Sequence, residues 1–133
     1  MVAAYRKTTG VRQMSDAEAA WVAGYLEGEG SFFAILTRAR PKARVSAVST
    51  DHDVLVRLAA FVGTGSVLTV TRRREIPGRK PSWYWSINTR ADVVALTDRL
   101  YPLMGARRRE QIEAMRVTIS APIHVLDREA EGW

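Results

Sequence analysis

Two glutamates in the N-terminal third of the chain are the first residues whose chemistry and spacing attract attention. Glu27 and Glu29 alternate with Gly28 and Gly30, directly after the apolar segment 22–26. Carboxylate oxygens are the donors that hard divalent cations such as Mg²⁺ prefer. A cation would also offset the unfavourable placement of an acid at the negative, C-terminal end of a helix. Taken alone, the string is more typical of an ordinary helix end with two solvated glutamates, and a metal site is the second interpretation.

The element that must position these acids is a helix. Ser15 followed by Glu18 is a capping-box pattern, which predicts a helix over about residues 16–28. A glycine inside a helix costs about 1 kcal/mol relative to alanine, so close approach of another backbone is expected to compensate. Gly28 and Gly30 suit the C-terminus of the helix, where left-handed backbone geometry is common. Three small residues recur every fourth position on one face of this helix: Ala20, Gly24 and Gly28.

The amino-acid composition limits the classes of protein to which this chain can belong. The 133 residues are 47% hydrophobic, enough for one domain with a core. No run approaches the roughly 18 apolar residues of a membrane span, and the start lacks the apolar stretch of a secretion signal. Cysteine is absent and only His52 and His124 could offer imidazole, so thiolate chemistry and a histidine-rich zinc site are excluded. We expect a cytoplasmic protein.

Charge points to a polyanionic partner. The net charge is +6, and residues 38–80 hold ten Lys or Arg residues against three acids. A concentrated basic region is typical of a protein that binds nucleic acid, whereas a merely solvated basic surface is the alternative. If the partner is DNA, the protein is expected to associate with the nucleoid.

Hydrophobic periodicity and turn signals predict one α+β domain over residues 15–120, between a basic tail (1–14) and a C-terminal tail (121–133). The predicted order is αββαββα with one further helix, giving an antiparallel sheet whose helices cover one face. Its expected elements after the first helix are strands 31–38 and 44–49, helix 51–62, strands 66–71 and 82–88, and helices 91–103 and 107–119.

Alternation along the strands separates two faces of the predicted sheet. Trp83, Trp85 and Ile87 should face the helices, which leaves polar side chains on the open face. A small twisted sheet fits the DNA major groove, where Arg and Lys bind guanine edges or phosphates and hydroxyls make adaptable base contacts. The predicted DNA-binding residues are Ser31, Phe33, Thr37, Arg38, Arg40, Lys42, Arg44, Tyr84 and Ser86, with Arg72, Arg73, Arg74, Arg79 and Lys80 in the loop that follows the third strand.

The segment 22–30, followed by Ser31 and Phe32, resembles the LAGLIDADG motif of the homing endonucleases in a variant that ends Glu-Gly-Glu-Gly. The resemblance spans about residues 15–118. It includes segments 51–58, 63–66, 81–83 and 104–107, each weak alone but in the family's order. The motif occurs once, and single-motif members of the family are homodimers. The resemblance therefore implies a saddle-shaped sheet and a dimer that uses the motif helix of each chain.

The same resemblance implies roles for individual residues. Two Glu29 carboxylates, one from each subunit, would hold Mg²⁺, with the Gly28 carbonyl as a further ligand. Arg107, with Arg109 as the second choice, would stabilise negative charge. Glu27 is expected to be structural, near the base of the dimer contact. The predicted contact residues are Ala20, Gly24, Glu27 and Gly28.

The function implied is a Mg²⁺-dependent homing endonuclease, encoded in an intron or intein, that makes double-strand breaks in a long, partly palindromic DNA target. The alternative is a non-cleaving nucleic-acid binder of the same fold, either a regulator or an intron maturase with RNA as partner. One departure concerns the end of the second strand, where the family often has a water-positioning glutamine. Residues 47–50 of this chain are Ala-Val-Ser-Thr.

Overall fold

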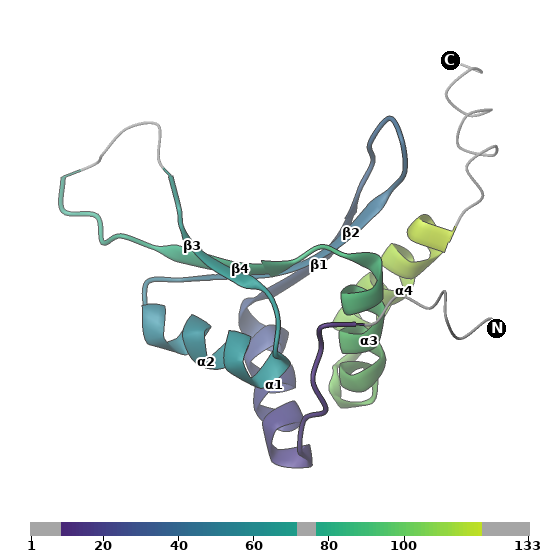
Figure 1. Ribbon diagram of the computed structural model, residues 1–133, viewed down its shortest axis with the longest axis horizontal. Helices are drawn as coiled ribbons and strands as arrows, with labels where there is room; N and C mark the ends of the chain where they lie inside the picture. The colour runs from purple at the N-terminus through teal and green to yellow at the C-terminus, as the bar shows by residue number, and fades with distance from the viewer. Residues whose placement is uncertain (1–8, 72–76, 121–133) are drawn as a thin grey trace.

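A four-stranded antiparallel sheet organises the computed structural model, which describes residues 9–71 and 77–120. The strands lie in the order β1-β2-β4-β3, and the helices cover one face of the sheet (Figure 1). The predicted α+β class and order of elements are confirmed. In chain order the elements are α1 (Asp16–Glu29), β1 (Gly30–Ile35), β2 (Lys42–Ser49), α2 (His52–Val62), β3 (Ser66–Thr69), β4 (Trp83–Ile87), α3 (Arg90–Leu100), the 3₁₀ helix η2 (Tyr101–Leu103) and α4 (Ala106–Ser120).

Helix α1 begins with the predicted capping box. The Ser15 hydroxyl accepts a hydrogen bond from the Glu18 amide at 3.1 Å, and the Glu18 carboxylate accepts one from the Ser15 amide at 2.9 Å. Arg12 donates to the same carboxylate at 2.8 Å. Both bonds hold the pKa of Glu18 below its ordinary value, and the bond from Arg12 has the larger effect. The first turn of α1 is therefore fixed by local bonds that the sequence already contains.

Glycine ends α1 for a different physical reason from the one expected. Gly30 has φ −85°, so the predicted left-handed conformation is wrong. A Cβ at Gly30 would instead lie 2.6 Å from the Leu26 carbonyl oxygen and 3.0 Å from the Leu26 Cα. Glycine is required here because β1 starts directly against the last turn of the helix. The left-handed glycine is found at the end of α2, where Gly63 has φ +90°.

The core lies between the sheet and the helices. The inward residues of β4, Trp85 and Ile87, are buried as predicted, and the Trp85 indole donates to the Thr64 carbonyl at 3.1 Å. Trp83 is half-buried and packs against the same core. These tryptophans therefore support the helices and are not placed for base stacking. The largest fully buried aliphatic side chains are Leu26, Leu55, Leu58, Leu96, Leu100 and Ile112.

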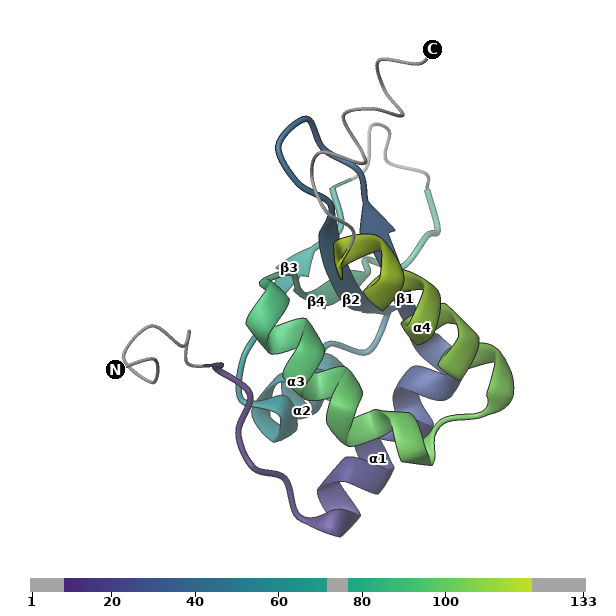
Figure 2. The ribbon, with the colours of Figure 1, turned by 90° about the vertical axis from the view of Figure 1, so that its right-hand side faces the viewer.

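The third predicted helix is too long by one turn. Helix α3 ends at Leu100, and the chain continues as the 3₁₀ helix η2. Pro102 explains the break, because proline has no amide hydrogen and its ring clashes with the preceding turn of an α-helix. Strand β3 is also shorter than predicted and ends at Thr69. Figure 2 shows α3 and α4 side by side beneath the sheet, with α4 below β1.

Residues 9–14 belong to the folded structure, although the sequence placed them in a tail. Met14 is buried, and the Arg12 amide donates to the Val62 carbonyl at 2.9 Å. Thr9 and the Gly10 amide both donate to the Asp92 carboxylate, at 2.8 and 2.7 Å. The segment thus joins α2 to the start of α3. Among the described residues, no helix has the length and apolar character needed to cross a membrane.

Candidate functional site

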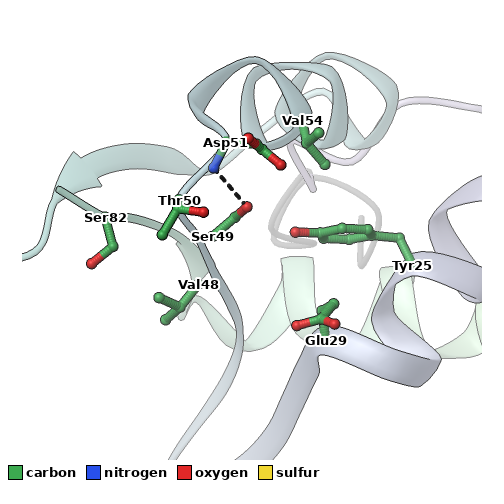
Figure 3. Close-up of a pocket in the computed structure, with 8 residues that line it drawn as sticks. All are labelled: Tyr25, Glu29, Val48, Ser49, Thr50, Asp51, Val54 and Ser82. Atoms are coloured by element: carbon green, nitrogen blue, oxygen red, sulfur yellow. Dashed lines mark hydrogen bonds between the residues drawn. The ribbon is translucent and has the colours of Figure 1, made fainter. Parts of the chain in front are cut away.

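Glu29 lies at the mouth of a cleft of about 420 Å³ between the end of α1 and the end of β2. In Figure 3, Tyr25 and Glu29 project from α1, and the segment 49–51 forms the opposite wall. The Glu29 side chain is exposed and has no hydrogen bond or ion pair with any residue of the described ranges. An exposed carboxylate that none of these residues binds suits an external cation. The lining residues are Tyr25, Glu29, Val48, Ser49, Thr50, Asp51, Val54 and Ser82.

Tyr25 forms the apolar wall of this cleft. Its ring stacks on Trp21 with centroids 5.4 Å apart and planes within 3°. Burial raises the pKa of Tyr25, and a hydrogen bond with Ser49 only partly opposes the rise, to which the negative charges of Glu29 and Asp51 add. The phenol therefore stays neutral at physiological pH. The Ser49 hydroxyl also accepts from the Asp51 amide at 2.9 Å (Figure 3).

Residues 47–50, where the family's water-positioning glutamine is missing from the sequence, lie partly in the core and partly at the cleft. Ala47 is buried and faces the helices, whereas Ser49 and Thr50 line the cleft opposite Glu29. Hydroxyl groups are therefore present where the family often has an amide. A role of Ser49 or Thr50 in holding water stays a prediction.

Glu27 is held by its own chain, in contrast to Glu29. Its carboxylate accepts a hydrogen bond from the Gly105 amide and lies 3.7 Å from the Arg108 Nε. The same Nε donates to the Glu27 backbone carbonyl at 3.0 Å. These contacts join the end of α1 to the start of α4, which is a supporting arrangement. A place for Glu27 in a dimer contact stays a prediction.

The three arginines at the start of α4 have three different environments. Arg107 is exposed and has no hydrogen bond or ion pair within the described part of the chain. Arg109 donates to the carbonyls of Tyr101 and Pro102, at 3.1 and 3.0 Å. Arg108 is buried at 6% exposure, with its guanidinium 5.9 Å from the centre of the Phe32 ring. Of the three, Arg107 has the side chain that is free to meet an external anion.

Arg108 is the residue that sequence reasoning missed. A signal for it existed, because the buried stripe of α4 contains Ile112, Met115 and Ile119, and Arg108 continues that spacing by one turn. The clustering of three positive charges hid this pattern. Its anionic partner, Glu27, explains why an arginine is tolerated near a helix N-terminus.

The predicted small-residue stripe on α1 lies on the surface. Ala20, Gly24 and Gly28 are all exposed. A Cβ at Gly24 or Gly28 would meet no described atom within 4 Å. The packing of the residues that the structure describes therefore gives no reason for glycine at either position.

The open face of the sheet carries predicted DNA-binding residues from three strands. Ser31 and Phe33 are exposed on β1, and Lys42 is exposed on β2. Arg44, Tyr84 and Ser86 are half-buried, and the Arg44 Nε has no hydrogen-bond partner among the described residues. Because the strands alternate, the face that carries these side chains is opposite the helices.

The remaining predicted contacts lie at the loops. Thr37, Arg38 and Arg40 are exposed at the tip of the β1–β2 hairpin, outside the strands. The Thr37 hydroxyl is already used to close this tip, because it accepts from the Arg40 amide at 3.1 Å and donates to the Arg40 carbonyl. Arg79 and Lys80 are exposed before β4. The predictions for Arg72, Arg73 and Arg74 fall outside the described residues.

A metal at Glu29 would need donors besides the side chains of the described residues. These residues contain no group of three His, Cys, Asp or Glu side chains that could hold a cation. Glu29 is a hard oxygen donor at an exposed helix end, so it suits Mg²⁺ chemically but supplies one carboxylate only.

Comparison with known proteins identifies the fold. No family model matches the sequence, and no curated protein matches it. Among solved structures, the homing endonuclease I-CvuI in complex with its target is similar at 17% identity and a TM-score of 0.59, covering 77% of this chain and 66% of that one. The group I intron-encoded homing endonuclease I-CeuI complexed with DNA is similar at 15% identity and a TM-score of 0.57, covering 91% of this chain and 60% of that one.

A third similar structure is matched over a smaller share of its own length. The LAGLIDADG meganuclease I-AabMI bound to uncleaved DNA is similar at 18% identity and a TM-score of 0.58, covering 74% of this chain but 35% of that one. The chain thus spans less than two thirds of the length of the proteins it resembles. At these identities the likeness concerns architecture, and the chain has the fold of the LAGLIDADG homing endonucleases.

Proposed function

We propose that this chain is a sequence-specific DNA endonuclease that acts as a homodimer and cleaves both strands in the presence of a divalent cation. One observation carries the proposal: the exposed Gly24 and Gly28 stripe leads directly to Glu29, a carboxylate without a hydrogen-bond or ion-pair partner among the described residues. Two copies packed through this stripe would bring two such carboxylates together at their dyad.

The stripe supports a partner helix because no contact among the described residues requires glycine at Gly24 or Gly28. Each helical glycine costs about 1 kcal/mol relative to alanine, and the open space at Gly24 and Gly28 means that alanine would fit. Close helix approach across a two-fold axis is a physical reason to keep them. A two-fold protein in turn matches a partly palindromic DNA target.

The chain's own residues would divide the work at the cleft. Glu29 would bind the cation together with a phosphate oxygen, and the Gly28 carbonyl is close enough in sequence to contribute. A cation bound there would polarise the phosphodiester and lower the pKa of an attacking water. Arg107, the unpaired arginine of the α4 start, would stabilise the negative charge that develops on the phosphate.

The basic hairpin tip and the open face supply the DNA-binding surface in this proposal. Arg38 and Arg40 at the tip, and Lys42 on β2, are exposed on neighbouring segments. The structures compared above contain DNA and give support to DNA as the partner, whereas they give none to RNA. The non-cleaving alternative remains a DNA binder that uses the same face.

Cleavage of a DNA library tests the proposal directly. The wild-type protein with Mg²⁺ should cut a small set of related sequences on both strands, and Glu29→Gln should bind the same sequences without cutting. Glu110→Gln, on the exposed surface of α4, is the matched control and should cut normally. Specific binding with no cutting by wild type would favour the non-cleaving alternative, and absence of specific binding would refute both.

The dimer is tested by Gly24→Leu. The larger side chain should block helix approach and shift the protein to the mass of one chain in light-scattering measurements. Ala60→Leu, an exposed position on α2, is the control and should leave the mass of two chains. An unchanged dimer in Gly24→Leu would show that the stripe is not the contact.

A further inference from the structure

The antiparallel register arranges the open face in rows that cross the sheet. Ser31 of β1 lies opposite Ser46 of β2, Ser46 lies opposite Ser86 of β4, and Ser86 lies opposite Ser66 of β3. Each strand therefore contributes one serine to a single row. Short hydroxyl side chains along this row leave room for a ligand to approach the sheet.

The neighbouring row, toward Glu29, is apolar at both ends. Tyr84 lies opposite Val48 on one side and opposite Leu68 on the other. Val48 is 52% exposed and Leu68 is 49% exposed, and Val48 also lines the cleft that contains Glu29. We call Val48, Tyr84 and Leu68 the apolar row.

Along β1 and β2, positive charge increases with distance from the cleft, whereas Arg79 and Lys80 precede β4 at the other end of the sheet. Beyond the serine row lies the pair of Phe33 and Arg44, then Ile35 and Lys42, and then the hairpin tip with its arginines. Cations at this end suit phosphates, which are present at every nucleotide and carry no sequence information. The three residues of the apolar row carry no charge and are therefore placed to do something other than bind phosphate.

Valine and leucine can read one feature of a base pair. They neither donate nor accept hydrogen bonds, and among the groups on the major-groove edges the thymine methyl is the apolar one. We propose that the apolar row reads thymine methyl groups in the part of each half-site nearest the cleft, which makes Val48 and Leu68 specificity-determining residues. The inference rests on the proposed DNA-binding function and goes beyond it by assigning the base.

The surroundings favour DNA over an apolar protein surface as the occupant. Serines flank the apolar row on one side and the acidic cleft flanks it on the other, so the apolar area is narrow. The basic hairpin continues the same face, and the chain carries a net charge of +6. A polyanion with isolated methyl groups matches this pattern better than a broad hydrophobic partner does.

Deoxyuridine provides the test because it differs from thymidine by the methyl group alone. Target duplexes are first selected from a random library with the full-length Glu29→Gln protein, and each thymine of the selected site is then replaced by uracil. We expect one or more replacements in each half-site to weaken binding about fourfold, the ratio for loss of one buried methyl group. In the variant Val48→Ser/Leu68→Asn, which has no methyl group at either position, and in the same Glu29→Gln background, thymine and uracil duplexes should bind equally.

Lys42→Ala in that background is the matched control, since it should weaken both duplexes by the same factor and reduce the salt dependence of binding. Uracil substitution without effect at every position, on a duplex that the protein selects, would overturn the inference and leave the proposed function intact. Failure to select any duplex would refute the proposed function itself. Loss of self-association in Val48→Ser/Leu68→Asn, with the thymine preference unchanged, would assign the apolar row to a protein contact and overturn the inference.

Discussion

At the scale of residues, the clearest lesson is that adjacent identical side chains have separate tasks. Successive residues on a helix point about 100° apart, so a run of three arginines samples three environments. Arg108 is buried against Glu27 and Phe32, Arg109 binds the carbonyls of η2, and Arg107 is exposed. We therefore expect Arg108 to contribute to the stability of the fold and Arg107 to contribute to the proposed reaction.

Substitution by methionine tests this separation. Arg108→Met should lower the free energy of unfolding by about 2 kcal/mol, because it removes a hydrogen bond to a helix-end carbonyl and leaves Glu27 without its cation. Arg107→Met should change it by less than about 0.5 kcal/mol and yet slow single-turnover cleavage by the proposed enzyme. Urea unfolding and cleavage assays on both variants give the comparison. Similar unfolding midpoints would contradict the supporting role of Arg108.

At the scale of elements, α1 shows which structural features are local and which are not. Its start could be predicted because Ser15 and Glu18 form their bonds within one turn. Its end could not, because the fixing contacts come from Gly105 and Arg108, about 80 residues away in sequence. The same reason explains the misassigned role of Gly30, whose constraint is contact with Leu26 and not its own φ angle.

The two glycines at the end of α1 give a matched pair. Gly30→Ala should destabilise the fold by about 2 kcal/mol, since its Cβ would lie 2.6 Å from a backbone oxygen that cannot move aside freely. Gly28→Ala has open space and should stabilise the isolated chain by about 1 kcal/mol through helix propensity, while weakening the proposed dimer. Thermal unfolding at low protein concentration, combined with light scattering, measures both effects. Equal destabilisation by the two substitutions would argue against this difference in packing.

At the scale of the whole molecule, residues 9–14 close the fold by joining α2 to α3. This contact could not be predicted, because the segment is mostly polar and its partners, Val62 and Asp92, are distant along the chain. By contrast, the order of strands and helices and the inward face of β4 could be predicted, since alternation and turn residues are local signals. The open cleft around Glu29 depends on tertiary packing, and the motif located only one of its walls.

Low pH should weaken the contact between residues 9–14 and the start of α3. Burial raises the pKa of Asp92, but hydrogen bonds from Thr89, the Gly10 amide and Thr9 outweigh it and hold the pKa below 3.8. A carboxyl group whose pKa is lowered by folding stabilises the folded state at pH values above its ordinary pKa. That stability is lost as the pH falls through the pKa of the folded state. Asp92→Asn should therefore cost about 1 kcal/mol at pH 7 and much less near pH 3.

Chemical denaturation of wild type and Asp92→Asn at both pH values checks this expectation. Asp98→Asn serves for comparison, because that carboxylate is exposed and pairs with Arg116 on the surface, so its loss should cost less at pH 7. A cost for Asp92→Asn that does not change between pH 7 and pH 3 would contradict the ionic character of the closure.

The strict alternation along β2 has a consequence for protein engineering. The inward side chains Ala43, Val45 and Ala47 are part of the core, whereas the outward ones lie on the opposite face of the sheet, so the two sets can be varied separately. A combinatorial library restricted to outward positions would alter recognition on a constant scaffold, and each member should keep the melting temperature of the parent within a few degrees. The positions open to such redesign on this strand are Lys42, Arg44, Ser46 and Val48.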